Sequence, residues 1–348
     1  MGAFAIGDSG LTTSGERLVE TPENPIPVGG LVFRIETSDG VPLRVASWAA
    51  MGPIPRGTVL LMQGRAEFIE KYAETVTDLL RRGYAVVAFD WRGQGGSGRS
   101  TQEPTKGHVD DFALFRHDVE AIAQHVLDAM PKPVVGLAHS MGGCIAVTGA
   151  REGWLPVERL VAIAPMIELK LVKHPRTVRA LIRILARLGL GRHFVPGGNG
   201  RSISTLPFPG NRLSSDPARY ARNAGLAEAV GVVAIGAPTI GWLNAAYRAM
   251  ARFREPGFAG VIGIPTLIVA AGADPVCATA AIAAFAEELK TGPALIIPDA
   301  RHEILMERDA IRAAFWAAFD AFLSETESSA PQALEHERVQ ARVAAGHD

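Results

Sequence analysis

The chain has 348 residues, 48% of them hydrophobic, and a formal net charge of −1. This length is enough to bury a sizeable core, and the near-neutral charge argues against the chain-wide basic surplus of a nucleic-acid-binding protein. Two cysteines, Cys144 and Cys277, are too few for a disulfide framework. No run reaches the roughly 18 uninterrupted apolar residues of a membrane-spanning helix.

The first segment, residues 1–30, carries Asp8, Glu16 and Glu20 among glycines and prolines. It lacks the basic start and apolar run of a secretory signal, so we expect an irregular leader. The protein is therefore expected to be cytoplasmic, with contact to a membrane surface left open.

Strands and helices then alternate, which is typical of a mostly parallel sheet covered by helices on both faces. The expected strands are 31–37 and 43–49 (a hairpin around an Asp-Gly turn), 58–62, 85–90, 134–137, 160–164, 264–271 and 294–298; the expected helices are 69–82, 109–129 and 142–150. The fold class predicted is α/β, with one core in two parts, 31–165 and 261–323. A polar tail follows at 324–348, with a helical pattern in 332–345. The glycines of 91–98 have the wrong spacing for a dinucleotide loop, so no cofactor is expected.

The segment Pro133–Gly143 reads Pro-Val-Val-Gly-Leu-Ala-His-Ser-Met-Gly-Gly. A short apolar run predicts a buried strand, and Ser140 follows it at a sharp turn into a stretch of small residues. This layout is typical of a nucleophile elbow, in which a strained turn raises a serine hydroxyl above the sheet edge. Ala138 stands where the usual Gly-x-Ser-x-Gly pattern has its first glycine. The alternative is a serine that caps a buried helix.

A long insertion separates the strands expected at 160–164 and 264–271. We assign residues 166–260 to a helical cap. Between Met166 and Pro256 it has 14 Lys/Arg against 4 Asp/Glu, a balance of +10 within a chain of net −1. The insertion is therefore expected to carry a strongly basic surface.

The first part of the cap has the pattern of a basic amphipathic helix. Arg179, Arg183 and Arg187 are four residues apart and share one helix face, with Lys173 just before them. We expect the apolar residues to fill the other face: Val178, Leu181, Ile182, Leu185 and Leu188. Such a helix is either a solvated face of a packed pair or a docking surface for an anionic membrane, and both interpretations stay open.

Other apolar cap residues are candidates for lining an acyl channel, and are equally suited to the cap's own core. They are Phe194, Phe208, Trp242, Leu243 and Tyr247.

An acid and a histidine follow the last two expected strands. Asp274 comes directly after 264–271, and His302 follows 294–298. Ser140, Asp274 and His302 thus stand in the order of a Ser–acid–His triad, each past the carboxyl end of a strand. Imidazole takes the serine proton, and the carboxylate orients the ring. Asp299 is a competing acid, but it is poorly placed only three residues from the histidine.

Acyl transfer also needs two backbone N–H groups aimed at the developing negative charge. One is expected from Met141, the residue after the nucleophile. The other is expected from the loop after strand 58–62, through the main chain of Arg65. No metal is expected in this chemistry.

Four blocks of the sequence carry a resemblance to a known family: 63–72 (Gln-Gly-Arg-Ala-Glu-Phe-Ile-Glu-Lys-Tyr), 89–97, 138–143 and 300–305. Together they resemble the monoacylglycerol lipase and lysophospholipase L2 group of α/β-hydrolases, the serine aminopeptidase S33-like hydrolases. The resemblance implies the α/β-hydrolase fold with an inserted cap, and hydrolysis of fatty-acid esters of glycerol or of a lysophospholipid. Gln63-Gly64 stands where many relatives have His-Gly, which is closer to the lysophospholipase L2 side. The blocks also point to Glu67 and Glu303 as supporting residues.

The function predicted is a serine hydrolase that cleaves carboxylic esters of fatty acids, lysophospholipids or monoacylglycerols, through an acyl-enzyme. Alternatives on the same residues are a small-ester esterase, a proline-releasing aminopeptidase and an acyltransferase. A non-catalytic binding protein normally lacks one of the triad residues, and all three are present here. The sequence leaves the head group, the acyl length and the oligomeric state open.

Overall fold

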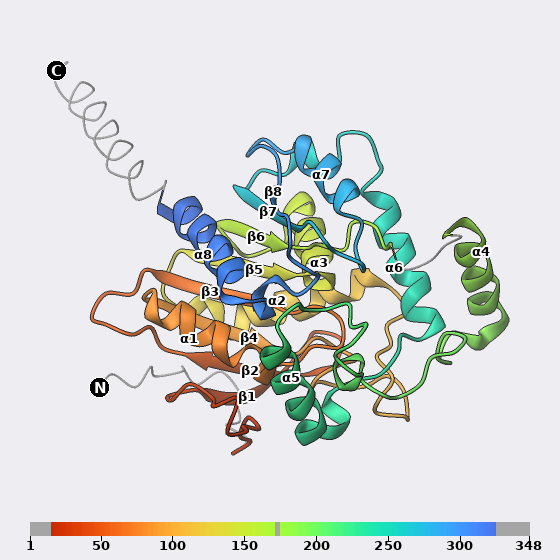
Figure 1. Cartoon of the computed structure of the whole chain (residues 1–348), viewed down its shortest axis with the longest axis horizontal. Helices are drawn as coiled ribbons and strands as arrows, with labels where there is room; N and C mark the ends of the chain where they lie inside the picture. The colour runs from red at the N-terminus through yellow and green to blue at the C-terminus, as the bar shows by residue number, and fades with distance from the viewer. Residues whose placement is uncertain (1–14, 171–174, 325–348) are drawn as a thin grey trace.

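The computed structural model of the chain describes residues 15–170 and 175–324. Three of the segments discussed above fall outside the described residues: the first part of the leader, Lys173, and the helical pattern at 332–345. Within the described residues, one eight-stranded sheet has the order β1-β2-β4-β3-β5-β6-β7-β8 (Figure 1). The pairs β1–β2 and β2–β4 are antiparallel, and every later pair is parallel.

The strands are β1 Leu31–Glu36, β2 Pro42–Trp48, β3 Gly57–Met62, β4 Tyr84–Phe89, β5 Val134–His139, β6 Arg159–Ile163, β7 Thr266–Ala271 and β8 Leu295–Ile297. The α-helices are α1 Ala73–Arg81, α2 Phe115–His125, α3 Met141–Glu152, α4 Pro175–Leu185, α5 Pro217–Val230, α6 Ile240–Arg252, α7 Thr279–Glu287 and α8 Asp309–Ser324. All the expected strands are present, with ends that differ by one or two residues.

The core lies in two layers, one on each face of the sheet. Successive side chains of a strand point to opposite faces, so in β3 Val59 and Leu61 join one layer while Leu60 and Met62 join the other. The first layer is covered by α1 and α8, and the second by α2, α3, α6 and α7. Burial of both faces explains why the central strands are continuous apolar runs.

Two predicted helices are shorter than expected. The helix expected at 69–82 begins as a 3-10 turn, Ile69–Tyr72, before α1. The helix expected at 109–129 was placed too early: Asp111 is extended, with φ −148° and ψ 138°, and its side chain accepts from the Ala113 amide. Aspartate caps helices well, so the helical segment starts after it.

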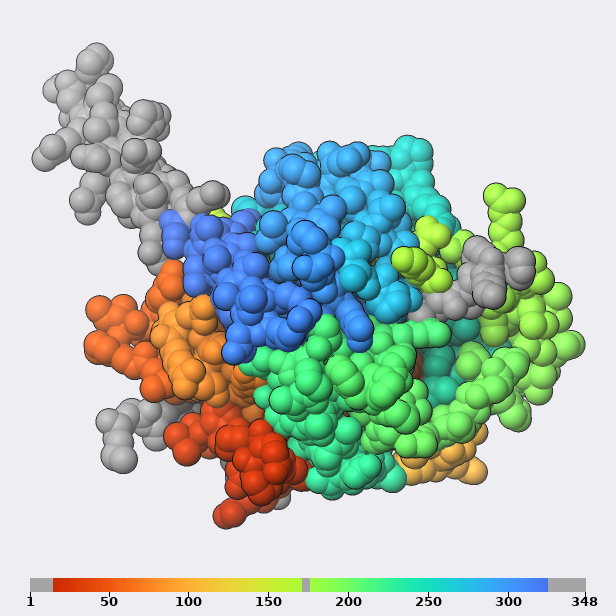
Figure 2. Space-filling model, viewed as in Figure 1, coloured from red at the N-terminus to blue at the C-terminus, as the bar shows by residue number. Residues whose placement is uncertain are grey.

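The chain between β6 and β7 contains α4, α5 and α6, and we call residues 166–260 the cap segment. The green α5 region lies against the blue C-terminal part of the chain (Figure 2). There the Ser214 hydroxyl donates to the Met306 carbonyl at 2.6 Å, and Arg219 pairs with Asp309 at 2.7 Å. Helix α4 lies at one end of the molecule (Figure 1).

The expected burial of the apolar residues in α4 and in the π-helical turn after it, Ala186–Leu190, is partly wrong. Ile182 is buried and Leu185 packs against the core, but Leu181 and Leu188 are 47% and 69% exposed. The side of this helical segment that faces α6 is buried, and Leu181 and Leu188 lie on another side.

Residues 15–30 have no helix or extended strand, but they pack on the core: the Asn24 side chain donates to the Glu70 carbonyl at 2.9 Å. Among the described residues, the helices are too short or too polar to span a bilayer.

Candidate active site

Ser140 lies at the turn between β5 and α3, in a conformation that side chains rarely adopt, with φ 50° and ψ −109°. Its amide donates to the Ile163 carbonyl at 3.0 Å, which holds the turn against β6. A Cβ at Gly142 would overlap the Met62 carbonyl, so only glycine lets α3 begin this close to the end of β3. Ala138 is fully buried, and its methyl group is accommodated in the core. The segment therefore has the geometry expected of a nucleophile elbow.

The structure brings Ser140, His302 and Asp274 together. The Ser140 Oγ is 2.9 Å from His302 Nε2, and His302 Nδ1 is 2.8 Å from Asp274 Oδ2. Asp299 is exposed, and Asp274 is the acid that contacts the ring. A hydroxyl, an imidazole and a carboxylate thus lie in one hydrogen-bonding sequence, which is the geometry that a serine nucleophile, its base and an orienting acid require.

Asp274 is fixed at the start of the loop after β7. Its Oδ1 accepts the amides of Val276 and Cys277 at 2.7 and 3.0 Å, which leaves Oδ2 for the histidine. Burial works to raise the pKa of Asp274, but the charge and hydrogen bond of His302 and the two amides bring it below its ordinary value. The carboxylate therefore stays ionised beside the ring.

The buried thiol of Cys277 also lies beside this set. The ligating atoms of Asp274, Cys277 and His302 lie within 4.8 Å of one another, the spacing of a metal site. Burial, followed by the charge of Asp274, raises the pKa of Cys277 well above its ordinary value. A protonated thiol is a poor ligand, and both ring nitrogens of His302 are already hydrogen-bonded, so these residues do not fit a metal.

The loop after β3 approaches the elbow closely. A Cβ at Gly64 would lie 2.8 Å from His139 Nδ1, so the backbone before Arg65 packs directly beside the residue before Ser140. The Arg65 guanidinium donates to the Gly236 carbonyl at 2.8 Å and lies 5.0 Å from the Trp242 ring centroid, both in the cap segment. Burial lowers the pKa of Arg65 to about 9. The role of the Arg65 and Met141 amides as oxyanion donors stays a prediction.

A buried charged network surrounds Glu67 in this loop. Its carboxylate accepts from the Gly64 amide at 2.5 Å, Lys71 Nζ at 2.8 Å, the Tyr72 hydroxyl at 2.7 Å and His139 Nδ1 at 2.9 Å. Burial works to raise the pKa of Glu67, but the positive charges of Lys71 and His139 bring it well below its ordinary value.

The same network reaches the loop that carries His302. Lys71 Nζ also contacts Glu303 at 2.6 Å, and His139 Nε2 is 3.1 Å from the His302 carbonyl oxygen. Burial works to lower the pKa of His139, but the Glu67 charge raises it above its ordinary value, which favours a doubly protonated ring that donates to both oxygens. Glu67 and Glu303 were expected to support the site. Lys71 and His139 were missed, although the spacing of Glu67 and Lys71 is that of a helical ion pair.

The five candidate channel residues are spread over the cap segment. Trp242 and Tyr247 are buried in the core layer that α6 covers, and Leu243 is partly buried there. Phe194 lies under Lys106, and Phe208 packs edge-on against Tyr220. Among the described residues, no hydrogen bond or ring contact joins the five to Ser140, His302 or Asp274, and a channel role stays a prediction.

Comparison with known proteins places this site in context. Residues 53–309 match the sequence model of the family described as serine aminopeptidase, S33. The chain is 30% identical over 293 residues to lysophospholipase L2 of Escherichia coli (strain K12), covering 82% of this chain and 85% of that protein. It is 33% identical over 152 residues to the monoglyceride lipase of Homo sapiens, covering 42% and 46%.

The arrangement of the fold is also found in solved structures. A soluble variant of monoglyceride lipase from Saccharomyces cerevisiae, in complex with a substrate analog, superposes with a TM-score of 0.66 at 20% identity and covers 83% of this chain and 94% of that chain.

Proposed function

Because the chain belongs to the serine aminopeptidase S33 family, we propose that it releases fatty acids from lysophospholipids, through an acyl-enzyme formed on Ser140. The chain has the α/β-hydrolase fold and is a carboxylic ester hydrolase. The observation that carries the mechanism is the chain of contacts from Ser140 through His302 to Asp274, at 2.9 and 2.8 Å.

In the proposed mechanism, His302 takes the proton of Ser140 as the hydroxyl oxygen attacks the ester carbonyl. Asp274 holds the ring in the right tautomer and stabilises the imidazolium. The tetrahedral oxyanion is held by the amides of Met141 and Arg65. His302 then protonates the leaving alcohol, and a water activated by the same ring releases the fatty acid.

The lysophospholipid substrate is supported by the match to lysophospholipase L2, which extends over most of both chains. Monoacylglycerol is the second candidate, because the human monoglyceride lipase is 33% identical over a shorter alignment of 152 residues. The two substrates share the glycerol ester and differ in the phosphate head group.

The test is a substrate panel with the wild type and Ser140→Ala. It compares lysophosphatidylcholine, 1-monoacylglycerol, p-nitrophenyl esters from acetate to palmitate, and a prolyl amide. Release of long-chain fatty acid from lysophosphatidylcholine, lost in the variant, is the expected result. Turnover of only short esters or of the amide would overturn the lipid assignment and keep the triad.

We also propose that the basic cap segment docks on anionic membranes, where such a substrate resides. Activity on anionic vesicles should then exceed activity on neutral ones and fall as salt is added. Equal rates on anionic and neutral vesicles, at both low and high salt, would refute docking.

A further inference from the structure

The positive charge of the cap segment is not spread evenly in the folded protein. Several of its arginines are neutralised by acids within ion-pair distance: Arg219 and Arg222 by Glu74, Arg252 by Glu152, and Arg254 by Glu168. In contrast, no acidic side chain among the described residues pairs with Arg183 on α4 or with Arg187 in the π-helical turn Ala186–Leu190 that follows it. Arg176 and Arg179 on α4 also lack an acidic partner among the described residues, as do Arg192, Arg201 and Arg212 later in the cap segment. Much of the unneutralised charge therefore lies on α4 and the turn after it.

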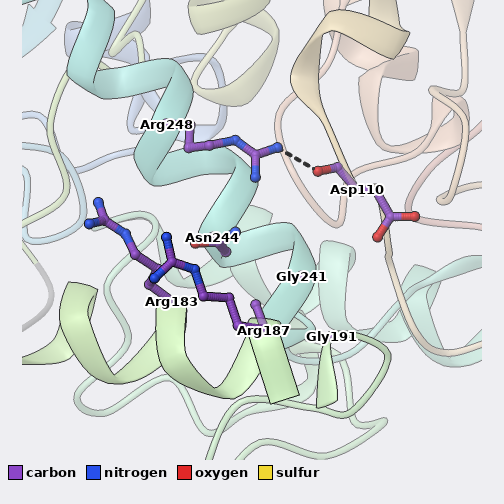
Figure 3. A pocket seen from close by; sticks show the side chains of 8 residues that line it. Asp110, Arg183, Arg187, Gly191, Gly241, Asn244 and Arg248 are labelled. Carbon is purple, nitrogen blue, oxygen red and sulfur yellow. Dashed lines mark hydrogen bonds between the residues drawn. The ribbon is translucent and has the colours of Figure 1, made fainter. Parts of the chain in front are cut away.

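Arg183 and Arg187 border a cleft of about 510 Å³ between α4 and α6. Figure 3 shows their side chains rising from α4 toward α6, from which Asn244 and Arg248 enter the same space. The cleft is thus lined by three guanidinium groups and one amide.

The floor of the cleft is a close contact between two glycines. The Gly241 amide donates to the Gly191 carbonyl at 2.8 Å, and a Cβ at Gly241 would lie 2.6 Å from the His108 ring. A side chain at Gly241 would overlap His108, so this close contact requires glycine there.

One acid also lines the cleft, and its carboxylate is directed elsewhere. Asp110 accepts Arg248 Nη2 with its backbone carbonyl at 2.7 Å, while its side chain lies 3.1 Å from His108 Nε2. In Figure 3 the Asp110 carboxylate points away from the guanidinium groups. Arg248 also pairs with Asp111 at 3.0 Å, so Arg183 and Arg187 supply most of the unopposed charge.

A phosphate group fits this donor set. Guanidinium groups bind phosphate oxygens through paired, charge-assisted hydrogen bonds, and three of them from two helices surround one small space. Helix α4 and the turn after it also expose apolar side chains: Leu181, Ile184 and Leu188 are 47%, 53% and 69% exposed. Exposed apolar side chains beside a phosphate site favour a lipid over a free anion, because the acyl region of a lipid covers such a surface.

We propose that the cleft between α4 and α6 binds the phosphate of an anionic membrane lipid and thereby seats the cap segment on the bilayer. This inference rests on the proposed docking of the cap segment on membranes. It assigns part of that docking to one defined binding site, in addition to the general attraction of the basic surface. It uses no residue of the triad.

The experiment measures binding of the full chain to vesicles of phosphatidylcholine with and without phosphatidylglycerol. The pocket variant Arg183→Ala/Arg187→Ala is compared with Arg176→Ala/Arg212→Ala, which removes the same charge from exposed cap positions outside the cleft. We expect the pocket variant to bind anionic vesicles about 30-fold more weakly, at about fivefold for each arginine, and the control to lose about fivefold or less. Unfolding temperatures should match the wild type, since all four side chains are exposed or half-buried.

Inorganic phosphate, added at constant ionic strength, should release the wild type from these vesicles more effectively than chloride does. Equal losses in the two variants would show diffuse attraction and overturn the site. A third outcome is that calorimetry detects binding of inorganic phosphate, while the pocket variant binds vesicles as tightly as the wild type. This outcome would identify a free anion as the ligand and overturn the lipid assignment. Binding is measured without turnover, so a chain that hydrolyses no lipid still gives a decisive answer here.

Discussion

Replacing Glu67 with glutamine is the sharpest test of the buried network behind the triad. The carboxylate accepts hydrogen bonds from Gly64, Lys71, Tyr72 and His139, and Glu67 is only 4% exposed. The glutamine amide has one oxygen and one NH2 group. The NH2 group would face donors in place of an acceptor, and the negative charge beside Lys71 would be lost.

The expected cost is large because a buried partner is removed. Breaking a buried ion pair on one side costs about 3–5 kcal/mol, since the remaining charge stays desolvated. In a protein of this size, each kcal/mol lowers the unfolding temperature by about 1.5 °C, so we expect a decrease of about 5–8 °C. The network also fixes the Gly64 amide and the His302 carbonyl, so kcat should fall more than KM changes.

The assay combines thermal unfolding with steady-state hydrolysis of p-nitrophenyl butyrate. Glu120→Gln is the matched control, because Glu120 pairs with Arg116 at 2.6 Å on an exposed helix surface, where such a pair contributes about 0.3–0.5 kcal/mol. An unfolding temperature for Glu67→Gln within a degree of the control would refute the reasoning. If the unfolding temperature falls and kcat is unchanged, the Glu67 network contributes to stability and not to catalysis.

Two further predictions concern the acid of the triad and the anchoring of the cap segment. Asp274→Asn should lower kcat for p-nitrophenyl butyrate by about 10⁴-fold, because the His302 ring loses its orienting carboxylate. Asp299→Asn is the control and should leave kcat unchanged. Similar losses of kcat in both variants would argue against Asp274 as the orienting acid. Burial works to raise the pKa of Glu74, but hydrogen bonds and charge from Arg219, Arg312 and Arg222 bring it to about 2. A lowered folded pKa means that the stabilisation is complete above the ordinary value of 4.5 and is lost as the pH falls toward 2. Glu74→Gln should therefore destabilise the protein by about 3 kcal/mol at pH 7, at about 1.4 kcal/mol for each pH unit between 4.5 and 2. This deficit, measured by thermal unfolding, should shrink steadily below pH 4.5, and a deficit independent of pH would contradict the prediction.

The sheet and the meeting of Ser140, Asp274 and His302 were predictable because their signals are local. Each of Ser140, Asp274 and His302 directly follows an apolar run, and parallel strands bring their carboxyl ends to one edge of the sheet. Gly142 was also readable as part of a tight turn. The glycine is necessary because Met62, at the end of a strand 80 residues earlier, approaches it closely, and the local sequence pattern gives no sign of this contact.

The charged network and the α4 surface were not predictable in the same way. Lys71 and Glu303 meet across 232 residues, and nothing near either position indicates the partner. The helical period of α4 and the turn after it separates basic from apolar residues. The apolar residues, however, form two neighbouring stripes, one that includes Ile182 and one that includes Leu181 and Leu188. Which stripe is buried depends on where α6 packs, so the exposure of Leu188 followed only from the tertiary structure.

The loop of residues 63–68 is held from two directions, and this links the cap segment to the chemistry. On the core side, Glu67 fixes the Gly64 amide at 2.5 Å. On the cap side, the Arg65 guanidinium contacts the Gly236 carbonyl at 2.8 Å and the face of Trp242. A displacement of the cap segment at Gly236 would therefore act on the residue whose amide is expected to hold the oxyanion. Phe68 in the same loop packs against Leu226 and Val230 of α5. If the cap segment docks as proposed, we therefore expect docking to affect turnover at Ser140 through the contacts of Arg65 and Phe68.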